Sequence, residues 1–246
     1  MNRISAYTVM GLAAFSGGGS LLLFGAFLIL APLGVMRLNL SEAQALIWDG
    51  ALCALFFVQH SMMIRQSFRR RLSAFVPSCC HAAVYAIASG AALTAVVLLW
   101  QTSPTTVFAL RGWLHWLPRV FSALALGVFV WGVRALRVFD PFGRRALWAH
   151  LRGQPLPQLP LAVRGPYVWV RHPLYSCMMV LIWSVPEAGL DRLLFDVLWT
   201  AWIVFGTRLE ERDLVAEFGD YYHRYQRIVP MLIPWRGPAG RRLQAS

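Results

Sequence analysis

The sequence has few charged residues and no lysine. Only 14% of its 246 residues are charged and 11 of them are acidic, whereas 58% are hydrophobic. Soluble domains usually contain about 45–50% apolar residues, so this composition argues against a soluble globular protein. Five long segments contain no Asp, Glu, Lys or Arg: residues 4–36, 50–64, 72–110, 120–133 and 172–186. Since about 20 mostly apolar residues cross a bilayer as a helix, the sequence predicts an all-α polytopic membrane protein.

Several signals of common chemistry are also missing. The four cysteines show neither a C-x-x-C pair nor a Cys/His spacing typical of metal sites, so we expect buried apolar cysteines and no metal. No G-x-G-x-x-G fingerprint is present, which argues against a dinucleotide-binding domain. No clear small-x-small cleavage site follows the first apolar run, so we expect that run to be a membrane helix rather than a signal peptide.

All 23 basic residues are arginine, and the formal net charge is +12. The arginines in segments that we assign to the outside are Arg37, Arg111, Arg119 and Arg192. The inside arginines are Arg3 and those within 65–71, 134–171 and 208–242. This asymmetry follows the positive-inside rule, so the charge needs no nucleic-acid partner. It places both termini on the cytoplasmic side of the membrane, which we expect to be a bacterial inner membrane, and inside arginines there contact anionic lipid headgroups.

The apolar segments and their flanks predict about six transmembrane helices. Their expected ranges are 20–36, 45–64, 82–100, 113–136, 173–185 and 192–209. After residue 209, aromatic and charged residues interleave with a helical period, which predicts a cytoplasmic amphipathic C-terminal helix. No repeat or low-complexity linker divides the sequence, so we expect one domain over 1–246. Within it, 1–139 is a four-helix membrane scaffold and 140–235 is a cofactor-binding catalytic region.

The first candidate site is the segment RGPYVWVRHPLY at 164–175. Arg171 and His172 stand directly before Pro173, which suits the first turn of a helix. Backbone N–H groups and the positive end of the helix dipole at such a position can hold an anionic group. The alternative interpretation is an ordinary basic anchor before a membrane helix.

The second candidate site follows one helical hairpin later, in the segment LEERDL at 209–214. Adjacent carboxylates at the end of a membrane helix are costly unless they are paired or functional. The alternative is a solvated surface helix whose Glu210 and Glu211 form weak pairs with nearby arginines. A hairpin returns the chain to the same membrane face, so we expect His172 and Glu210 to lie close together.

Together these segments carry a family resemblance. The ordered combination RGPYxxVRHPLY, hairpin, LEERDL, FGxYYxxY and VPMLIP resembles the isoprenylcysteine carboxyl methyltransferase and phospholipid methyltransferase superfamily of membrane enzymes. The resemblance is close over 164–234. Upstream, LFFVQHSMMIR at 55–65 and the segments at 76–77 and 140–145 are similar to the NnrU and methanethiol S-methyltransferase branch.

The resemblance implies an S-adenosylmethionine-dependent methyltransferase. The positions that it assigns to binding of S-adenosyl-L-methionine are Leu161, Tyr167, His172, Pro173, Leu174, Tyr175 and Glu210, with further backbone contacts around 159–162. A carboxylate suits the ammonium group of this methyl donor, and aromatic faces suit its sulfonium. The implied acceptor is a small thiol such as methanethiol or another lipophilic molecule.

Methyl transfer to a thiol needs a thiolate, because the thiolate is the reactive form. Arg171 or Arg208 can favour that anion, and the sequence does not choose between them. We group Glu211 with these two arginines as catalytic candidates. Gln59 and His60 are candidate substrate residues, because polar side chains at membrane depth are often functional. An interhelical hydrogen bond is the alternative interpretation of this pair.

Two departures from the related enzymes concern the acceptor. Gly206 stands where the isoprenylcysteine enzymes carry an arginine that orients the substrate carboxylate, which argues against a prenylcysteine acceptor. The methanethiol enzymes usually carry a Pro-Thr-Met-Thr-like turn where this chain has PEAGL at 186–190. Two other functions stay open at this point. They are a non-catalytic NnrU-like membrane protein linked to denitrification, and a sterol-reductase-like membrane oxidoreductase.

Overall fold

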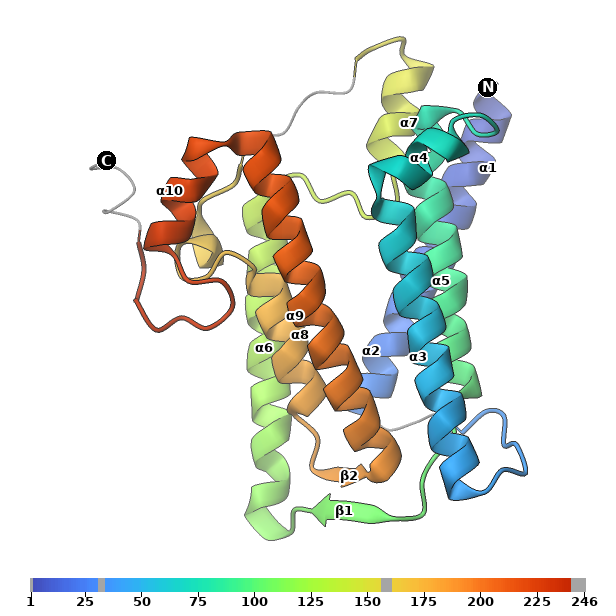
Figure 1. Cartoon of the computed structure of the whole chain (residues 1–246), viewed down its shortest axis with the longest axis vertical. Helices are drawn as coiled ribbons and strands as arrows, with labels where there is room; N and C mark the ends of the chain where they lie inside the picture. Colours follow the sequence, from blue (N-terminus) through green and yellow to red (C-terminus); the bar gives the residue numbers. More distant parts are fainter. Residues whose placement is uncertain (1, 31–33, 156–160, 240–246) are drawn as a thin grey trace. The chain divides into compact units, whose positions relative to one another are not determined.

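The structure, a computed structural model, describes residues 2–30, 34–155 and 161–239 (Figure 1). These residues are mostly helical, which confirms the all-α prediction in outline. The α-helices are α1 (Arg3–Ala13), α2 (Gly19–Ile29), α3 (Glu42–Ile64), α4 (Gln66–Leu72), α5 (His81–Leu99), α6 (Trp116–Leu136), α7 (Arg144–Leu151), α8 (Pro173–Trp183), α9 (Leu190–Phe218) and α10 (Asp220–Ile228). The π-helix is η1 (Ala14–Gly18), and the 3-10 helices are η2 (Ser78–Cys80), η3 (Gly112–His115) and η4 (Gly165–Val168).

Two short strands accompany the helices. β1 (Thr106–Ala109) and β2 (Glu187–Gly189) form a two-stranded sheet. The sequence analysis expects loops at both places. Strands of four and three residues are too short to leave a clear alternating pattern of apolar and polar residues, so periodicity did not reveal them.

The chain folds into two compact units, each built from segments that are distant in sequence. Unit 1 comprises Met1–Val107, Asp140–Gln158 and Ala188–Phe195. Unit 2 comprises Phe108–Phe139, Leu159–Glu187 and Asp196–Ser246. The expected boundary near residue 139 assigns α6 to an N-terminal scaffold, whereas α6 packs against α8 within unit 2. The single domain over 1–246 stays a prediction.

The first membrane helix begins earlier than predicted. We expect it over 20–36, whereas α1, η1 and α2 run together as a helical segment over Arg3–Ile29. Residues 31–33 of the expected range lie outside the described residues. The glycines at 17–19 lie in or beside η1 and do not break the helix. A Cβ atom at Gly17 would lie 2.8 Å from the Phe142 ring, so this glycine permits close packing rather than a turn.

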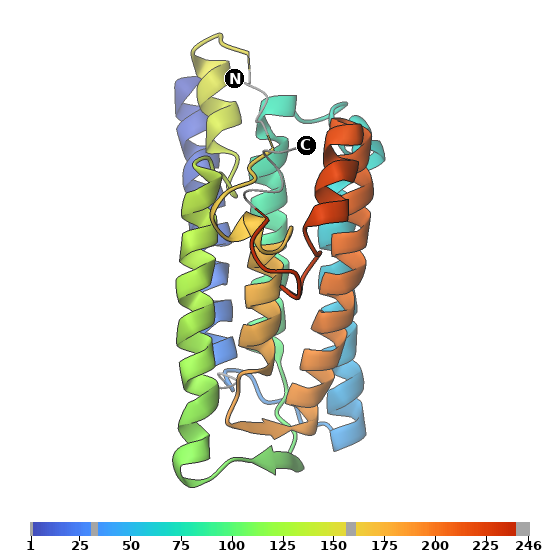
Figure 2. The same ribbon diagram turned by 90° about the vertical axis from the view of Figure 1, so that its left-hand side faces the viewer.

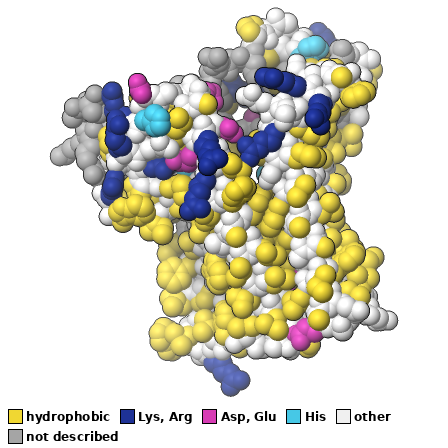
Figure 3. Space-filling model, viewed as in Figure 1, with side chains coloured by type: hydrophobic (Ala, Val, Ile, Leu, Met, Phe, Trp, Pro, Cys, Tyr) yellow, Lys and Arg dark blue, Asp and Glu magenta, His cyan; other side chains and the backbone are white. Residues whose placement is uncertain are grey.

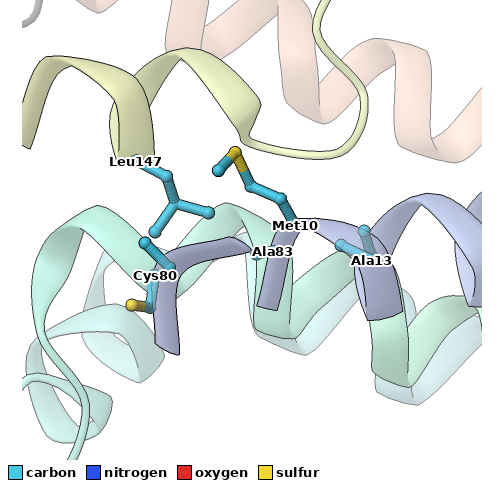
Figure 4. Close-up of a cluster of buried hydrophobic side chains, with 7 residues drawn as sticks. Met10, Ala13, Cys80, Ala83 and Leu147 are labelled. Atoms are coloured by element: carbon cyan, nitrogen blue, oxygen red, sulfur yellow. The ribbon is translucent and has the colours of Figure 1, made fainter. Parts of the chain in front are cut away.

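Small side chains allow the helices of unit 1 to pack closely. The buried cluster shown in Figure 4 contains Met10, Ala13, Cys80, Ala83 and Leu147. It joins α1, η2, α5 and α7, because the short side chains leave room for the longer Met10 and Leu147. The Tyr7 and Trp148 rings meet edge to face with their centroids 5.7 Å apart, which extends the contact between α1 and α7.

Four helical segments are long and apolar enough to cross a membrane. They are Arg3–Ile29, Glu42–Ile64, Ser78–Leu99 and Gly112–Leu136. Large apolar side chains on these helices are exposed, for example Leu22 at 78% and Ile47 at 73%. The face in Figure 3 shows hydrophobic side chains along the helices in the same way. Since such a surface suits lipid, the protein is an integral membrane protein. α8 has only 11 residues, and the six-span topology stays a prediction.

Unit 2 contains α6, α8, most of α9 and α10 (Figure 2). α6 and α8 approach closely because Gly132 admits Leu174, whose Cδ2 atom would lie 2.8 Å from a Cβ at Gly132. α9 runs for 29 residues and passes well beyond the predicted end at residue 209. The charged stretch after 209 therefore continues α9, and the separate helix α10 begins only after Gly219, whose φ is 56°. A positive φ of this kind is readily adopted only by glycine, which explains why the break falls at this position.

Substitution of Gly90 tests the close packing between α5 and the π-helix. A Cβ atom at this position would lie 2.6 Å from the Ser16 carbonyl oxygen. We expect Gly90→Ala to lower the free energy of unfolding by about 1–3 kcal/mol, because overpacking displaces the backbone. Thermal unfolding of the detergent-solubilised protein measures this change. Gly25→Ala on α2 is the control, since its added Cβ would have no described atom within 4 Å apart from its chain neighbours and the nearby backbone of its own helix. Equal melting temperatures of the two variants would contradict the packing.

Candidate functional site

The segment that follows α10 holds the start of α8 in place. Pro173 occupies the first turn of α8, where a missing N–H costs no helical hydrogen bond. The Arg171 N–H donates to the Pro230 carbonyl at 2.9 Å, and the His172 N–H donates to the Met231 carbonyl at 3.1 Å. These hydrogen bonds fix the backbone of Arg171 and His172 independently of the contacts of their side chains.

The Glu211 carboxylate on α9 is the centre of a buried network. Arg171 donates to both of its oxygens, from Nε to Oε1 at 2.8 Å and from Nη2 to Oε2 at 2.7 Å. The His172 Nε2 atom lies 2.7 Å from Oε1. The Tyr222 hydroxyl donates to Oε1 at 2.8 Å, and the Gln226 amide donates to Oε2 at 2.7 Å. Five contacts from four side chains therefore surround this one carboxylate.

This network sets the charge states at the site. Burial acts to raise the pKa of Glu211, but hydrogen bonds from His172, Arg171, Tyr222 and Gln226 outweigh it and hold that pKa well below its usual range. Burial raises the pKa of Tyr222, and the bond to Glu211 raises it further. Glu211 therefore stays ionised and Tyr222 stays a protonated donor. The geometry makes Glu211 an anchor for Arg171 and His172.

Arg171 is also bonded beyond Glu211. Its Nη1 atom donates to the Gln226 carbonyl at 3.1 Å and to the Val229 carbonyl. The guanidinium group thus joins α9 to the end of α10, and each of its nitrogens is already a donor within the protein. An arginine suits this position because its fixed fork of donors can bind a carboxylate and two carbonyls at once.

Glu210 precedes Glu211 on the same helix and has different surroundings. Its side chain is 44% exposed, whereas that of Glu211 is 9% exposed. The Glu210 Oε2 atom lies 3.9 Å from His172 Nδ1, so the imidazole lies between the two carboxylates. The Tyr175 ring stacks on the His172 ring at 5.6 Å with an interplanar angle of 11°. Burial raises the pKa of Tyr167 to about 12, and the charge of Glu210 adds to that effect.

The other predicted residues of this region lie in unit 2 as well. Leu161 packs against the apolar cluster of α10, and Leu174 packs against Gly132 on α6. Pro173 is buried at the start of α8. Arg208 is exposed on α9 and makes no hydrogen bond or ion pair with any part of the described chain. Residues 159–160, part of the predicted backbone contacts, lie outside the described residues.

The two candidate substrate residues belong to unit 1. Gln59 and His60 lie on α3, and both contact α5. The Gln59 Nε2 atom donates to Ser89 Oγ at 3.3 Å. The Tyr85 hydroxyl lies 2.6 Å from His60 Nε2. They therefore form a polar group within unit 1.

The contribution of α10 to the site was not predicted from the sequence. The tyrosines of this segment belong to the FGxYYxxY motif, but no role was expected for them. Tyr222, Tyr225 and Gln226 recur at the spacing of one helix face, and this spacing was the available signal. The Tyr225 hydroxyl donates to the Tyr167 carbonyl, which connects α10 to the segment before α8.

Removal of the Glu211 charge tests its role as an anchor. We expect Glu211→Gln to lower the free energy of unfolding by about 3–5 kcal/mol, because it leaves the buried Arg171 guanidinium without its counter-charge. Thermal unfolding in detergent measures the loss. Glu217→Gln is the control, since Glu217 is exposed on the same helix. Similar melting temperatures for Glu211→Gln and Glu217→Gln would refute the anchor.

Acidification provides an independent check of the same carboxylate. Its folded pKa lies below that of the unfolded chain, so its contribution to stability is present above about pH 4.3, the usual Glu pKa, and is lost as the pH falls below it. We therefore expect the stability difference between wild type and Glu211→Gln to shrink as the pH is lowered from 6 towards 3 in roughly unit steps. A difference that stays constant over this range would show that folding does not lower the pKa of Glu211.

The sequence is similar to those of several known proteins. The chain is 31% identical to the methanethiol S-methyltransferase of Mycobacterium tuberculosis H37Rv over 218 residues, which cover 84% of this chain and 82% of that protein. It is 34% identical to methanethiol S-methyltransferase 2 of Bradyrhizobium diazoefficiens, with 80% of this chain and 75% of that protein covered. It is 29% identical to mouse Nurim, with 71% and 70% covered.

No family model matches the sequence, and no solved structure matches it significantly. Three relatives named methanethiol S-methyltransferase, each from a different organism, are 31–34% identical to this chain and cover 80–84% of it. The resemblance expected from the motifs around His172 and Glu210 is thereby confirmed, and the chain belongs to the methanethiol S-methyltransferase family.

Proposed function

We propose that this protein is an S-adenosylmethionine-dependent membrane methyltransferase that methylates the sulfur of a small thiol, such as methanethiol, or another lipophilic acceptor. Family membership supports the reaction class. The observation that carries the proposal for this chain is the His172 imidazole between a buried, fully bonded Glu211 and a half-exposed Glu210. This arrangement leaves one carboxylate of the pair available to a ligand.

The residues around the start of α8 fit the chemistry of S-adenosylmethionine. The exposed carboxylate of Glu210 suits its ammonium group. α8 has no side-chain cap, so its first N–H groups suit the carboxylate of the donor. The rings of Tyr167 and Tyr175 suit the sulfonium by cation–π attraction. Leu161 and Leu174 add apolar contact surface. When bound, this donor supplies an activated methyl group.

The catalytic candidates divide into two kinds. Arg171 and Glu211 are bonded to one another and hold the site, so we assign them to positioning. Arg208 is an exposed cation on α9, and we assign it to the attraction of an anionic acceptor such as a thiolate. Methyl transfer by in-line displacement needs alignment of the reactants and exclusion of water, and it requires no metal.

The positions of the arginines support a cytoplasmic location of the site. In unit 1, Arg69, Arg70 and Arg71 are exposed directly after the membrane helix α3. In unit 2, Arg134 and Arg137 close α6 at the end that leads to the site segment. Arginine-rich ends face the cytoplasm in most inner-membrane proteins, so we place both termini and the donor site on the cytoplasmic side of a bacterial inner membrane.

Glu210 gives the direct test of this function. We expect wild-type protein in detergent to bind S-adenosylmethionine, and Glu210→Gln to bind it about 10- to 100-fold more weakly, the effect of one lost charged hydrogen bond. Isothermal titration measures both affinities. Glu217→Gln is the matched control on α9 and should bind like wild type. Absence of binding by the wild type, or equal affinities of Glu210→Gln and wild type, would overturn the proposal.

A further inference from the structure

Unit 1 buries a carboxylate towards the end of α3 that lies opposite the arginine-rich end. Asp49 lies about two helical turns after the start of α3 at Glu42 and is 0% exposed. Its Oδ1 atom accepts a hydrogen bond from the Gln101 backbone N–H at 3.0 Å. Its Oδ2 atom is buried and has no hydrogen-bond partner within the described chain. A buried carboxylate is costly unless it is paired or binds a metal ion, so Asp49 needs a further partner.

A second buried carboxylate lies near the first. Asp191 is the second residue of α9, belongs to unit 1 and is 4% exposed. Its Oδ2 atom accepts a hydrogen bond from Trp100 Nε1 at 3.1 Å. Because Trp100 and Gln101 are consecutive, one short stretch of backbone holds both carboxylates, and the charge of Asp191 acts on Asp49. Two like charges repel more strongly in apolar surroundings than in water, so this pair attracts a cation.

The end of α5 adds negative potential at the same place. α3 and α5 pack side by side (Figure 1), and α5 ends at Leu99, two residues before Gln101. The last carbonyl groups of a helix have no partner within it, and the helix dipole gives this end about half a negative charge. Trp48 Nε1 and Gln101 Nε2 donate to the Leu99 carbonyl at 3.1 Å and 2.7 Å. Both donors are neutral, so they satisfy a carbonyl without balancing the carboxylates.

One positive side chain is buried beside these acids. Arg192 follows Asp191 and is 5% exposed. With both carboxylates ionised, one guanidinium balances at most one of them, and the charge of one carboxylate is left over. The neighbouring Arg37 is exposed and Glu42 is partly exposed, so water screens both of these side chains. The buried charges at this end of unit 1 therefore favour one additional positive charge.

We propose that unit 1 binds one monovalent alkali cation, such as Na⁺, through the Oδ2 atom of Asp49. The carboxylate supplies the opposite charge, and the carbonyl oxygens at the end of α5 are ligands of the kind that hard cations prefer. A dehydrated sodium ion is smaller than a water molecule, so a buried position suits it. Ca²⁺ suits the position less well, because it takes six to eight oxygen ligands and usually several carboxylates. The bound ion stabilises the contact between α3 and the segment after α5.

This proposal differs from the expectation of no metal, which was drawn from the spacing of cysteine and histidine. Asp49 and Asp191 are far apart in the sequence, so no local motif marks the site. The proposal does not rest on the proposed function, because it concerns residues of unit 1 alone.

Thermal unfolding of the full chain in a non-ionic detergent tests the proposal, with sodium chloride compared with choline chloride. Equal ionic strength keeps general screening constant, so a difference between the salts reports an ion that binds the folded protein. We expect sodium at about ten times its dissociation constant to raise the unfolding midpoint of wild type by about 3–6 °C. Asp49→Asn removes the charge and keeps the shape of the side chain. Its midpoint should be the same in the two salts.

Glu42→Gln is the matched control, since it removes a partly exposed carboxylate from the same end of the same helix. Glu42 accepts a hydrogen bond from Ser103 and is not part of the buried group. The control should keep the full sodium shift of wild type, whatever its own midpoint in choline chloride. Loss of the sodium shift in Glu42→Gln together with its retention in Asp49→Asn would place the ion elsewhere and overturn the proposal.

A binding measurement without unfolding checks the same site. Sodium ions that bind a protein give a broader sodium-23 NMR signal than free ions, so wild type and Glu42→Gln should broaden the signal and Asp49→Asn should not. If Asp49→Asn does not fold, wild type alone still decides the matter. Equal midpoints of wild type in sodium, potassium and choline chloride would overturn the proposal.

Two further outcomes identify a different occupant. A wild-type midpoint that depends on pH but not on sodium at any fixed pH would mean that a proton neutralises Asp49. A larger shift with calcium chloride than with sodium chloride at equal ionic strength would mean that the site takes a divalent ion. Either result would overturn the proposal of a monovalent cation.

Discussion

The buried ion pair between Arg171 and Glu211 is the contact on which the site in unit 2 depends. Neither charge is tolerable alone in apolar surroundings, so each must find every partner that its chemistry requires. Glu211 obtains bonds from the start of α8 and from α10, and Arg171 reaches the carbonyls at the end of α10. Satisfying this one carboxylate therefore requires α9, α10 and the segment before α8 to meet.

The same constraint separates the functions of two neighbouring carboxylates. Successive residues on an α-helix point about 100° apart, so Glu210 and Glu211 cannot face the same surroundings. Glu211 turns inwards to the network, and Glu210 stays half exposed beside His172. His172 contacts both, which places an anchored side chain next to an available one. A site assembled in this way holds its shape without using the group that we propose to bind the ligand.

Polar side chains in the membrane-spanning part of unit 1 also need hydrogen-bond partners from another helix. Gln59 and His60 are kept within an apolar helix only because α5 supplies Ser89 and Tyr85 as partners. Close approach of the helices makes these contacts possible. At Gly90 the absence of a side chain lets α5 lie directly against the Ser16 backbone. The glycines of this region thus act through packing between helices and do not break the first helix.

The sequence by itself determined the membrane class, the approximate position of four apolar helices and the family, because these depend on composition, local periodicity and contiguous motifs. The sequence also predicted that His172 and Glu210 lie close together, since a helical hairpin returns the chain to the same membrane face. It placed the first helix too late and the end of α9 too early. The first error arose because glycines can either break a helix or permit close packing. The second arose because charged residues can either follow the end of a helix or continue it.

Only the tertiary structure decided which members of the motifs are anchors and which are available to a ligand. The sequence treats Arg171 and Arg208 as equal candidates, and it groups Glu211 with them. The structure separates them, because Arg171 and Glu211 neutralise one another while Arg208 is exposed. The physical reason is that the state of a buried charge is fixed by partners far away in the chain. Here those partners include Tyr222 and the carbonyls that follow it, and no local pattern encodes their approach.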